Sequence, residues 1–435
     1  MFFRYSDPIT KEQEHVFTLE FDEQGNGSAS IETTVTEFVF SEFGIYRGML
    51  FLEPGQKLQL KLPPLREKSF AEQKNPYFNP VSFWFLTETK QDLNNRISEF
   101  TRTSNQLTDK YFNQLYFQQS RTVFDSVSMA MNNKFPELSS ETFKINKMLS
   151  IKMIEVEAFR LETEKYSELF SSIKPQFWNQ PAFISIFEKA FDNQLGFKAK
   201  AIKGKAISDA VNRADIGFLI NFVQDNYKIQ GKTADLVLLK LLYDAYYSGY
   251  FSRASIMSMI KNERFSQNPD TIIKTASLEI SRKFNYLQKG TAAPVICLND
   301  LSGEKKCTDD NKEKFKYLIF ADADMIVCRE HMKYLSNIDE RFQKYLEIYV
   351  ILRNTDRNKI DTFFKENSVP GMKLVDENNA FISTYRIKSF PTCFLLDENH
   401  KVQITNTKAP LDGFEQQFGA FLQQELFQRQ RNQSR

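Results

Sequence analysis

The sequence predicts a mixed α+β protein built from three successive regions. Residues 1–65 carry short strand-like runs separated by tight-turn residues, which is typical of a small β-sandwich-like domain. Residues 66–289 place apolar side chains at helical spacing, which indicates an all-helical domain. In residues 290–435 strand-like and helix-like patterns alternate, as expected of an α/β domain.

Turn residues divide the first region into strands. The triplets Gly25-Asn26-Gly27 and Glu53-Pro54-Gly55 both predict turns. Strands are expected at residues 15–21, 28–40, 48–52 and 57–62. The proline-punctuated stretch from residue 63 to residue 80 is expected to be a linker or a long loop.

The second region is expected to be helical from residue 82 to residue 289. Leu107, Tyr111 and Leu115 recur every four residues, so they share one helix face. Glycine and proline residues interrupt the pattern and divide the region into about seven to nine helices. The longest apolar run, Leu236 to Tyr243, contains Lys240 and is far shorter than the roughly 20 residues that span a bilayer, so it predicts a buried helix.

The charge balance limits the kinds of partner. With 57 basic and 55 acidic residues the formal net charge is +2, which predicts neither a nucleic acid nor an anionic membrane as partner. The densest basic cluster is either a partner-binding patch or a solvated helix face, and it consists of Lys198, Lys200, Lys203 and Lys205. The three histidines, His15, His331 and His400, are far apart and no zinc or haem spacing is present, so no metal or other cofactor is expected.

The stretch from Phe320 to Arg329 carries the main chemical signal of the third region. It follows an apolar run and precedes a helical pattern, so it predicts a strand, a sharp loop and a helix with Cys328 in its first turn. At that position the positive end of the helix dipole is expected to favour the thiolate. A dithiol site needs Cys-x-x-Cys, however, and the position three residues before Cys328 is Met325.

Four further segments accompany this stretch along the chain. They are Gly290 to Pro294, a hairpin over 294–309 that turns at Leu301-Ser302-Gly303, Tyr385 to Thr392, and Phe394 to Val402. With these segments, residues 290–425 resemble the thioredoxin-fold thiol–disulfide oxidoreductases of the TlpA/ResA-like branch. The resemblance places Cys328 on the family's second cysteine, Met325 on its first, and Pro391 on its cis-proline. Ala321 and Asp324 depart from the usual bulky aromatics, and Ile326-Val327 separate the two cysteine positions.

The resemblance implies where the protein works and what it binds. It implies the periplasm or bacterial cell envelope, with a signal sequence removed, because Met1-Phe2-Phe3-Arg4 lacks a signal-peptide core; a cytosolic protein is the other possibility. It also implies that Met325, Phe390 and Pro391 hold an extended polypeptide partner. A cis bond between Phe390 and Pro391 is expected.

Three interpretations of the cysteines stay open. Cys328 can be a buried small hydrophobe without catalytic role. It can instead form a redox couple with Cys393, two residues after Pro391, or act as a monothiol. Cys297 and Cys307 face each other if the hairpin loop has three residues, which permits a structural disulfide.

The leading expectation is a cell-envelope thioredoxin-like protein that has lost dithiol catalysis and binds a polypeptide. The alternatives are an active thiol–disulfide oxidoreductase or isomerase that uses Cys328, and a structural assembly factor that acts through the first two regions. Asp322 and Asp324 can be read as paired catalytic carboxylates, but solvated or helix-capping roles are commoner for such residues. The oligomeric state is not predicted.

Overall fold

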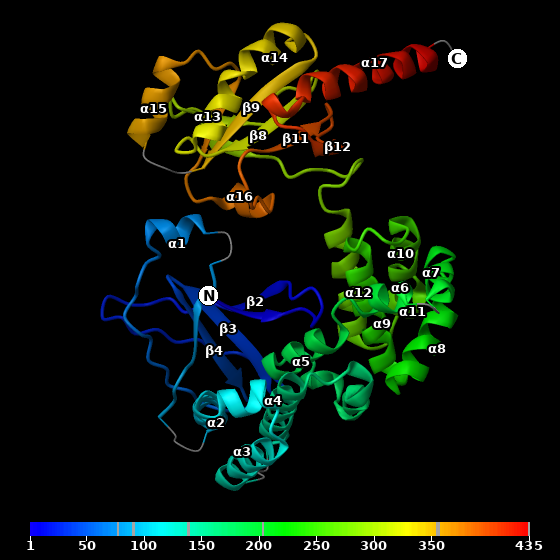
Figure 1. The fold of residues 1–435 in the computed structure, drawn as a ribbon. Coiled ribbons are helices and arrows are strands. Elements are labelled where there is room, and N and C mark those ends of the chain that lie inside the picture. Colours follow the sequence, from blue (N-terminus) through cyan, green and yellow to red (C-terminus); the bar gives the residue numbers. More distant parts are fainter. Residues whose placement is uncertain (76–77, 89–91, 137–139, 202–203, 354–356, 434–435) are drawn as a thin grey trace. The chain divides into compact units, whose positions relative to one another are not determined.

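The computed structural model describes residues 1–435 except 76–77, 89–91, 137–139, 202–203, 354–356 and 434–435. The chain divides into two compact units, Met1–Lys283 and Phe284–Arg435. The first unit holds a sheet and a large set of helices, and the second is an α/β unit (Figure 1). The predicted α+β class is therefore confirmed.

The strands of the first unit form one five-stranded sheet with the order β2-β1-β3-β4-β5. Adjacent strands are antiparallel except β4 and β5, which are parallel. The strands are β1 (Phe2–Tyr5), β2 (Gln13–Phe17), β3 (Glu37–Phe43), β4 (Tyr46–Leu52) and β5 (Val81–Trp84). The strand predicted over 57–62 is wrong, because those residues form no strand, and the strands predicted over 15–21 and 28–40 are present only at 15–17 and 37–40.

The expected sandwich is also corrected, because a helix and not a second sheet covers one face of these strands. Phe38, Phe40 and Phe51 pack against Leu93 and Ile97 of helix α2 (Leu93–Lys110). On the opposite face, Val39 and Leu50 pack with other residues of the sheet and its loops. Residues Phe38 to Ser41 of β3 are buried in succession, which shows that both faces are covered, but burial alone does not reveal what covers them.

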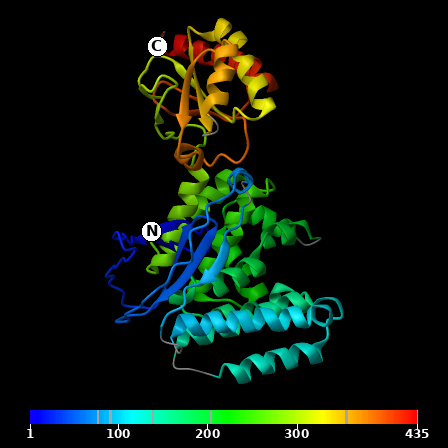
Figure 2. The ribbon, with the colours of Figure 1, turned by 90° about the vertical axis from the view of Figure 1, so that its left-hand side faces the viewer.

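Several helices of the first unit begin at polar caps or at a proline, as local sequence favours. Asp92, Ser120 and Ser140 accept backbone hydrogen bonds at the starts of α2, α3 and α4, and Pro181 lies in the first turn of α5. Helices α2 and α3 run side by side (Figure 2). Besides α2 the α-helices are α1 (Phe70–Lys74), α3 (Arg121–Lys134), α4 (Glu141–Phe159), α5 (Pro181–Phe191), α6 (Gln194–Lys200), α7 (Lys205–Asn212), α8 (Ile216–Tyr227), α9 (Gly231–Tyr247), α10 (Arg253–Ile260), α11 (Glu263–Ser266) and α12 (Thr271–Asn285).

Shorter helical turns join some of these helices: the π-helix η1 (Asn113–Phe117) and the 3₁₀ turns η2 (Thr163–Lys165), η3 (Ser167–Ser172) and η4 (Pro175–Phe177). Helix α9 contains the run Leu236 to Tyr243, and residues 236–242 are all buried, so the predicted buried helix is confirmed. The buried Lys240 ammonium pairs with Asp244 one turn later, at 2.8 Å. In the described part of the chain no helix combines the length and hydropathy needed to cross a membrane.

The second unit has a five-stranded sheet with the order β10-β9-β8-β11-β12. Strands β8, β9 and β10 are parallel to one another, whereas β11 is antiparallel to both β8 and β12. A separate hairpin, β6 (Cys297–Asn299) with β7 (Lys305–Cys307), precedes this sheet. The five strands are β8 (Phe315–Ala321), β9 (Leu346–Arg353), β10 (Met372–Asp376), β11 (Thr392–Leu396) and β12 (Val402–Thr407).

Both faces of this second sheet are covered. One face packs against α13 (Ile326–Lys333), α14 (Leu335–Phe342), α15 (Arg357–Glu366) and α17 (Phe414–Gln433), which all contribute to one buried cluster. The other face packs against the segment that contains Leu287 and Ile296 and against α16 (Ala380–Thr384). A short 3₁₀ turn, η5 (Pro410–Asp412), precedes α17.

A hydrogen-bonded contact between helix α2 and strand β4 of the first unit can be tested by mutation. The buried Asn94 side chain accepts a hydrogen bond from the Phe51 backbone N–H at 2.6 Å and donates to the Phe51 carbonyl at 2.9 Å. Asn94→Ala leaves both buried backbone groups of β4 without that partner, so we expect a loss of about 2–3 kcal/mol in the free energy of unfolding. Urea unfolding measures it. Asn105→Ala, at an exposed position of the same helix, is the matched control and should change little.

Candidate functional site

The candidate site lies where β8 ends and α13 begins. All seven residues of β8 are buried, and the chain leaves the sheet at Asp322. The Asp322 carboxylate accepts the Asp324 N–H at 2.9 Å, and its carbonyl accepts the Met325 N–H at 3.0 Å. These bonds close a tight loop, so that Met325 precedes the first turn of α13 without a side-chain cap of its own.

Cys328 is completely buried in the core of the second unit. Burial raises the pKa of its thiol, a backbone hydrogen bond from Asp322 lowers it in part, and the Asp322 carboxylate raises it further. The expectation that the helix dipole favours a Cys328 thiolate is therefore wrong. Loss of hydration on burial disfavours the charged thiolate and is the largest cause of the raised pKa.

The three residues before Cys328 are exposed although all are apolar. Exposed fractions are 39% for Met325, 68% for Ile326 and 55% for Val327. At the position where the resemblance expects an attacking sulfur, the surface thus carries a thioether, and two aliphatic side chains lie beside it. A thioether has no S–H and cannot become a thiolate, so it cannot form a mixed disulfide.

The segment before β11 contains the other predicted binding residues. The peptide bond between Phe390 and Pro391 is cis, and both side chains are half-buried. Strand β11 then pairs with β8, which places Thr392 opposite Phe320 and Cys393 opposite Ile319. The Pro391 segment therefore meets the sheet at the same end of β8 as the loop that carries Met325.

Cys328 and Cys393 lie in one buried cluster, and both thiols are free. Burial raises the pKa of Cys393 to about 12, a hydrogen bond with Tyr317 lowers it in part, and the charges of Asp412 and Cys328 raise it. The Tyr317 hydroxyl donates to the Lys408 carbonyl at 2.8 Å and lies 3.4 Å from the Cys393 sulfur. The structure thus brings the two thiols into one core without bonding them.

Arg353 belongs to this site although sequence reasoning missed it. Its guanidinium lies 3.7 Å from the buried Asp322 carboxylate and 5.7 Å from the centre of the Phe390 ring. It therefore connects the loop before α13 with the Pro391 segment. Its position in the sequence could have indicated this role. Arg353 is the last residue of β9 and Ala321 is the last residue of its parallel neighbour β8, and the ends of parallel strands lie together.

Both aspartates in the loop have a cationic neighbour. Asp322 faces Arg353, and a carboxylate oxygen of Asp324 lies 3.5 Å from the Lys359 ammonium. His331, one turn after Cys328, is buried and its Nδ1 accepts the Leu411 N–H at 3.1 Å, so the neutral ring carries its proton on Nε2. His15 lies on β2 of the first unit, and His400 lies in the turn between β11 and β12.

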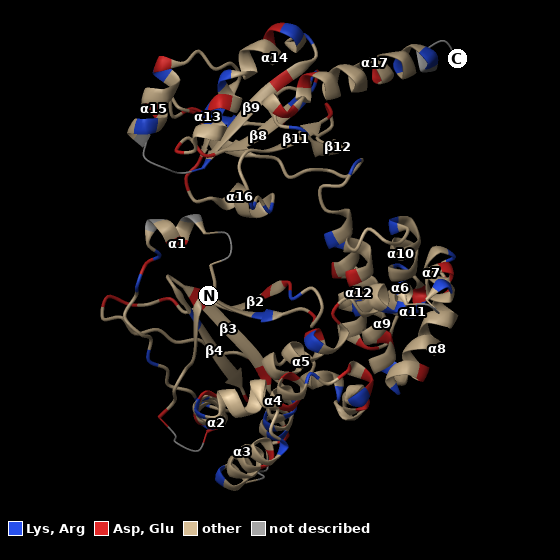
Figure 3. Ribbon diagram, in the orientation of Figure 1, with Lys and Arg blue, Asp and Glu red and all other residues tan. Residues whose placement is uncertain are grey.

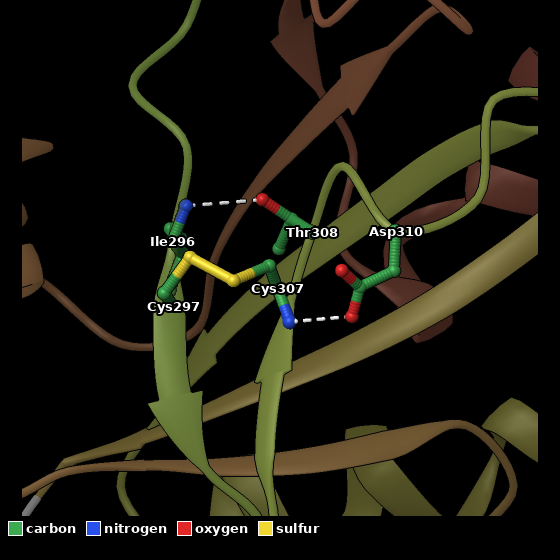
Figure 4. The surroundings of a disulfide bond; sticks show 5 residues. All are labelled: Ile296, Cys297, Cys307, Thr308 and Asp310. Atoms are coloured by element: carbon green, nitrogen blue, oxygen red, sulfur yellow. Dashed lines mark hydrogen bonds between the residues drawn. A yellow bond between two sulfur atoms is a disulfide. The ribbon is translucent and has the colours of Figure 1, made fainter.

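Cys297 and Cys307 form a disulfide with an S–S distance of 2.03 Å (Figure 4). The register of the hairpin places the two residues directly opposite each other, and Gly303 adopts a φ of +88° in the loop. Ile296 donates to the Thr308 hydroxyl at 3.0 Å, and Cys307 donates to the Asp310 carboxylate at 2.8 Å (Figure 4). Asp309 is the third member of the one group of close potential metal ligands in the described chain, but both sulfurs of that group are engaged in the disulfide.

A sheet of this order, with a helix after β8 and a cis-proline segment before β11, defines the second unit as a thioredoxin-like α/β domain. Residues 289–405 match the model of the AhpC/TSA family. The thiol-disulfide oxidoreductase ResA of Bacillus cereus is 27% identical over 133 residues, which are 29% of this chain and 77% of that protein. The thioredoxin-like protein YneN of Bacillus subtilis is 25% identical over 126 residues, which are 28% of this chain and 74% of that protein.

Among solved structures, the thioredoxin domain of a thiol-disulfide oxidoreductase from Bacteroides vulgatus has a TM-score of 0.29 and 21% identity, and the match covers 31% of this chain and 97% of that chain. The match to the family model falls within the second unit. The second unit thus has a thioredoxin-like fold, and the chain is similar in sequence to ResA-type thiol-disulfide oxidoreductases.

The buried thiols give a test in the unmodified protein. A pKa of about 12 against the ordinary 9.0 leaves the Cys393 thiolate about 1000-fold less populated near neutral pH, and Cys328 is shielded as well. We expect a coloured aromatic disulfide reagent to react slowly with the native chain near neutral pH, and faster as the pH rises above 9.0. In denaturant without reductant two thiols should react at once. Four reactive thiols would contradict the hairpin disulfide.

Proposed function

We propose that this chain is a thioredoxin-like protein of the bacterial cell envelope that binds a polypeptide and has lost dithiol catalysis. The observation that carries the proposal is the chemistry of positions 325 and 328. The exposed residue is a methionine, and the cysteine behind it is completely buried. Thiol–disulfide exchange needs an exposed thiolate that attacks and a second thiol that resolves the mixed disulfide.

An alternative function is exchange through Cys328, either alone or with Cys393. The shared core of the two thiols favours this alternative, because their charges affect each other. Their burial and raised pKa values oppose it, since a protonated thiol is a poor nucleophile and a substrate disulfide cannot reach it. We therefore place the alternative second.

Polypeptide binding is supported by the surface around the former redox position. The exposed Met325, Ile326 and Val327 offer apolar contacts, and methionine adapts its shape to different partners. The half-buried Phe390 and Pro391 lie at the same end of β8 as these residues. The backbone of the segment around Pro391 can hydrogen-bond an extended chain, whose side chains would contact the apolar residues.

An envelope location is supported by the resemblance and by the hairpin disulfide. Disulfides persist in oxidising compartments and are rare in the cytosol. The Cys297–Cys307 bond joins two neighbouring strands that backbone pairing and the Ile296–Thr308 hydrogen bond already hold together. We assign it a structural role in the proposed envelope protein.

Restoring the missing thiol tests the loss of catalysis. We expect Met325→Cys to reduce insulin, in the presence of dithiothreitol, about tenfold faster than the wild-type chain, because the new thiol is exposed at a helix N-terminus. The double variant Met325→Cys/Cys328→Ser is the control that lacks the resolving thiol. Insulin reduction by the wild-type chain that disappears in Cys328→Ser would instead establish the alternative function.

Polypeptide binding has its own test, which does not depend on redox chemistry. The double variant Ile326→Ser/Val327→Ser should bind a fluorescent, reduced and alkylated polypeptide about tenfold more weakly than the wild type, because two apolar contacts are lost. Fluorescence anisotropy measures the dissociation constant. Leu278→Ser removes an exposed leucine of α12 and is the matched control. Equal affinity of all three proteins would refute binding at this surface.

A further inference from the structure

A second surface of the molecule combines unneutralised cations with exposed aromatic rings. It lies on the first unit, on helices α6, α7 and α10 and the end of α9. We name it the α6–α10 patch, and it consists of Phe197, Lys200, Lys205, Tyr247, Tyr250 and Arg253. None of these residues belongs to the candidate site of the second unit.

Helix geometry and a close contact bring several members of the patch together. On α6 the residues Leu195 and Ala199 face the core, whereas Phe197 and Lys200 lie together on the outer face. The Lys200 ammonium lies 5.0 Å from the centre of the Tyr250 ring. Helix α6 packs on α7 and α9, and α10 packs on the same two helices.

Arg253 extends this surface along the start of α10. Its guanidinium lies 5.1 Å from the centre of the Tyr246 ring, which in turn lies 5.4 Å from the Tyr247 ring. Cations and rings thus alternate across the patch. Contacts of this kind hold a positive charge beside an aromatic face without neutralising it.

The net charge of the whole chain does not reveal the local positive charge of the patch. Residues 194–213 contain five basic residues and a single acidic one, Asp209, whereas the rest of the chain has an acidic excess of two. Figure 3 shows basic segments on α6, α7 and α10. Lys198 pairs with Glu164, but Lys200, Lys205 and Arg253 form no ion pair with any other residue that the structure describes.

The aromatic residues indicate which anionic partner fits. Phe197 is 67% exposed, and Tyr247 and Tyr250 are also more than half exposed. Protein interfaces are depleted in lysine, whereas lysine together with Phe and Tyr is the composition of surfaces that lie in the headgroup region of anionic bilayers. There the ammonium groups meet phosphates and the rings enter the boundary of the acyl chains.

We propose that the α6–α10 patch docks this chain on the surface of a bilayer that contains anionic phospholipids. Phe197 inserts among the headgroups, Tyr247 and Tyr250 lie at their level, and Lys200, Lys205 and Arg253 contact phosphates. The expectation of no membrane partner rested on the net charge of +2, which averages over this local excess. The inference concerns the first unit and does not rest on the function proposed for the second.

Sedimentation of the full chain with vesicles tests the proposal. We expect binding to phosphatidylcholine vesicles that contain about one third phosphatidylglycerol, no binding to pure phosphatidylcholine, and loss of binding at high salt. Lys200→Glu/Lys205→Glu should weaken binding about 25-fold or more, since each lysine near an anionic surface contributes about fivefold. Phe197→Ser should weaken it as well, even at low salt.

The control is Lys57→Glu/Lys61→Glu, which makes the same change of net charge at two other exposed lysines of the first unit. It should keep most of the binding, and thermal unfolding should be alike for all variants. The proposal is overturned if the anionic vesicles do not sediment the chain, or if the control pair weakens binding as much as the patch pair. It is also overturned if soluble polyglutamate binds the patch more tightly than the vesicles, which would assign the surface to an acidic protein.

Discussion

Strand β8 is the element on which the geometry of the second unit depends. It pairs with β9 on one side and β11 on the other, and all of its residues are buried. Tyr317 and Ile319 face the cluster that contains Cys328, while Leu318 and Phe320 face the opposite cluster. A shift of one residue would exchange these two sets of side chains, so the register of β8 is strongly specified. That register determines where the chain leaves the sheet and where α13 begins.

The register of β8 also determines the environment of the free thiols in the second unit. Because α13 begins close to the end of β8, its first turn exposes Ile326 and Val327 and directs Cys328 into the core. Cys393, on the neighbouring strand β11, is directed into the same core. Low polarity keeps both thiols protonated. The Cys297–Cys307 pair lies on a separate hairpin and is half-buried, so its bond is a property of that hairpin and not of the former redox position.

In the first unit the proposed function lies on the surface and not in the buried core. Helix α9 is buried over most of its length, and the helices around it supply the exposed faces. The polar contacts of Asn94 tie the helical layer to the sheet from within. Among the exposed apolar side chains of this unit, those of α6 and the end of α9 lie close to cationic residues. Large rings that are gathered in one exposed patch indicate a partner.

Local features were determined by the sequence itself. The turn glycines, the apolar run that becomes β8, the buried helix around Leu236 and the replacement of a cysteine by Met325 are all properties of short stretches. The opposition of Cys297 and Cys307 is local too, because a short hairpin sets its own register. The cis bond before Pro391 followed from the family resemblance and is present in the structure.

Other features were decided by the tertiary structure alone. A strand pattern cannot tell whether a helix or a second sheet will cover it, so the predicted sandwich became a single sheet under α2. The pKa of Cys328 depends on how deeply the fold buries it, and the connection from Arg353 to Asp322 and Phe390 depends on strands distant in sequence. The α6–α10 patch likewise unites four helices. Each of these features depends on burial or on charge interactions between residues that are far apart in the sequence. A short stretch of sequence therefore cannot predict them.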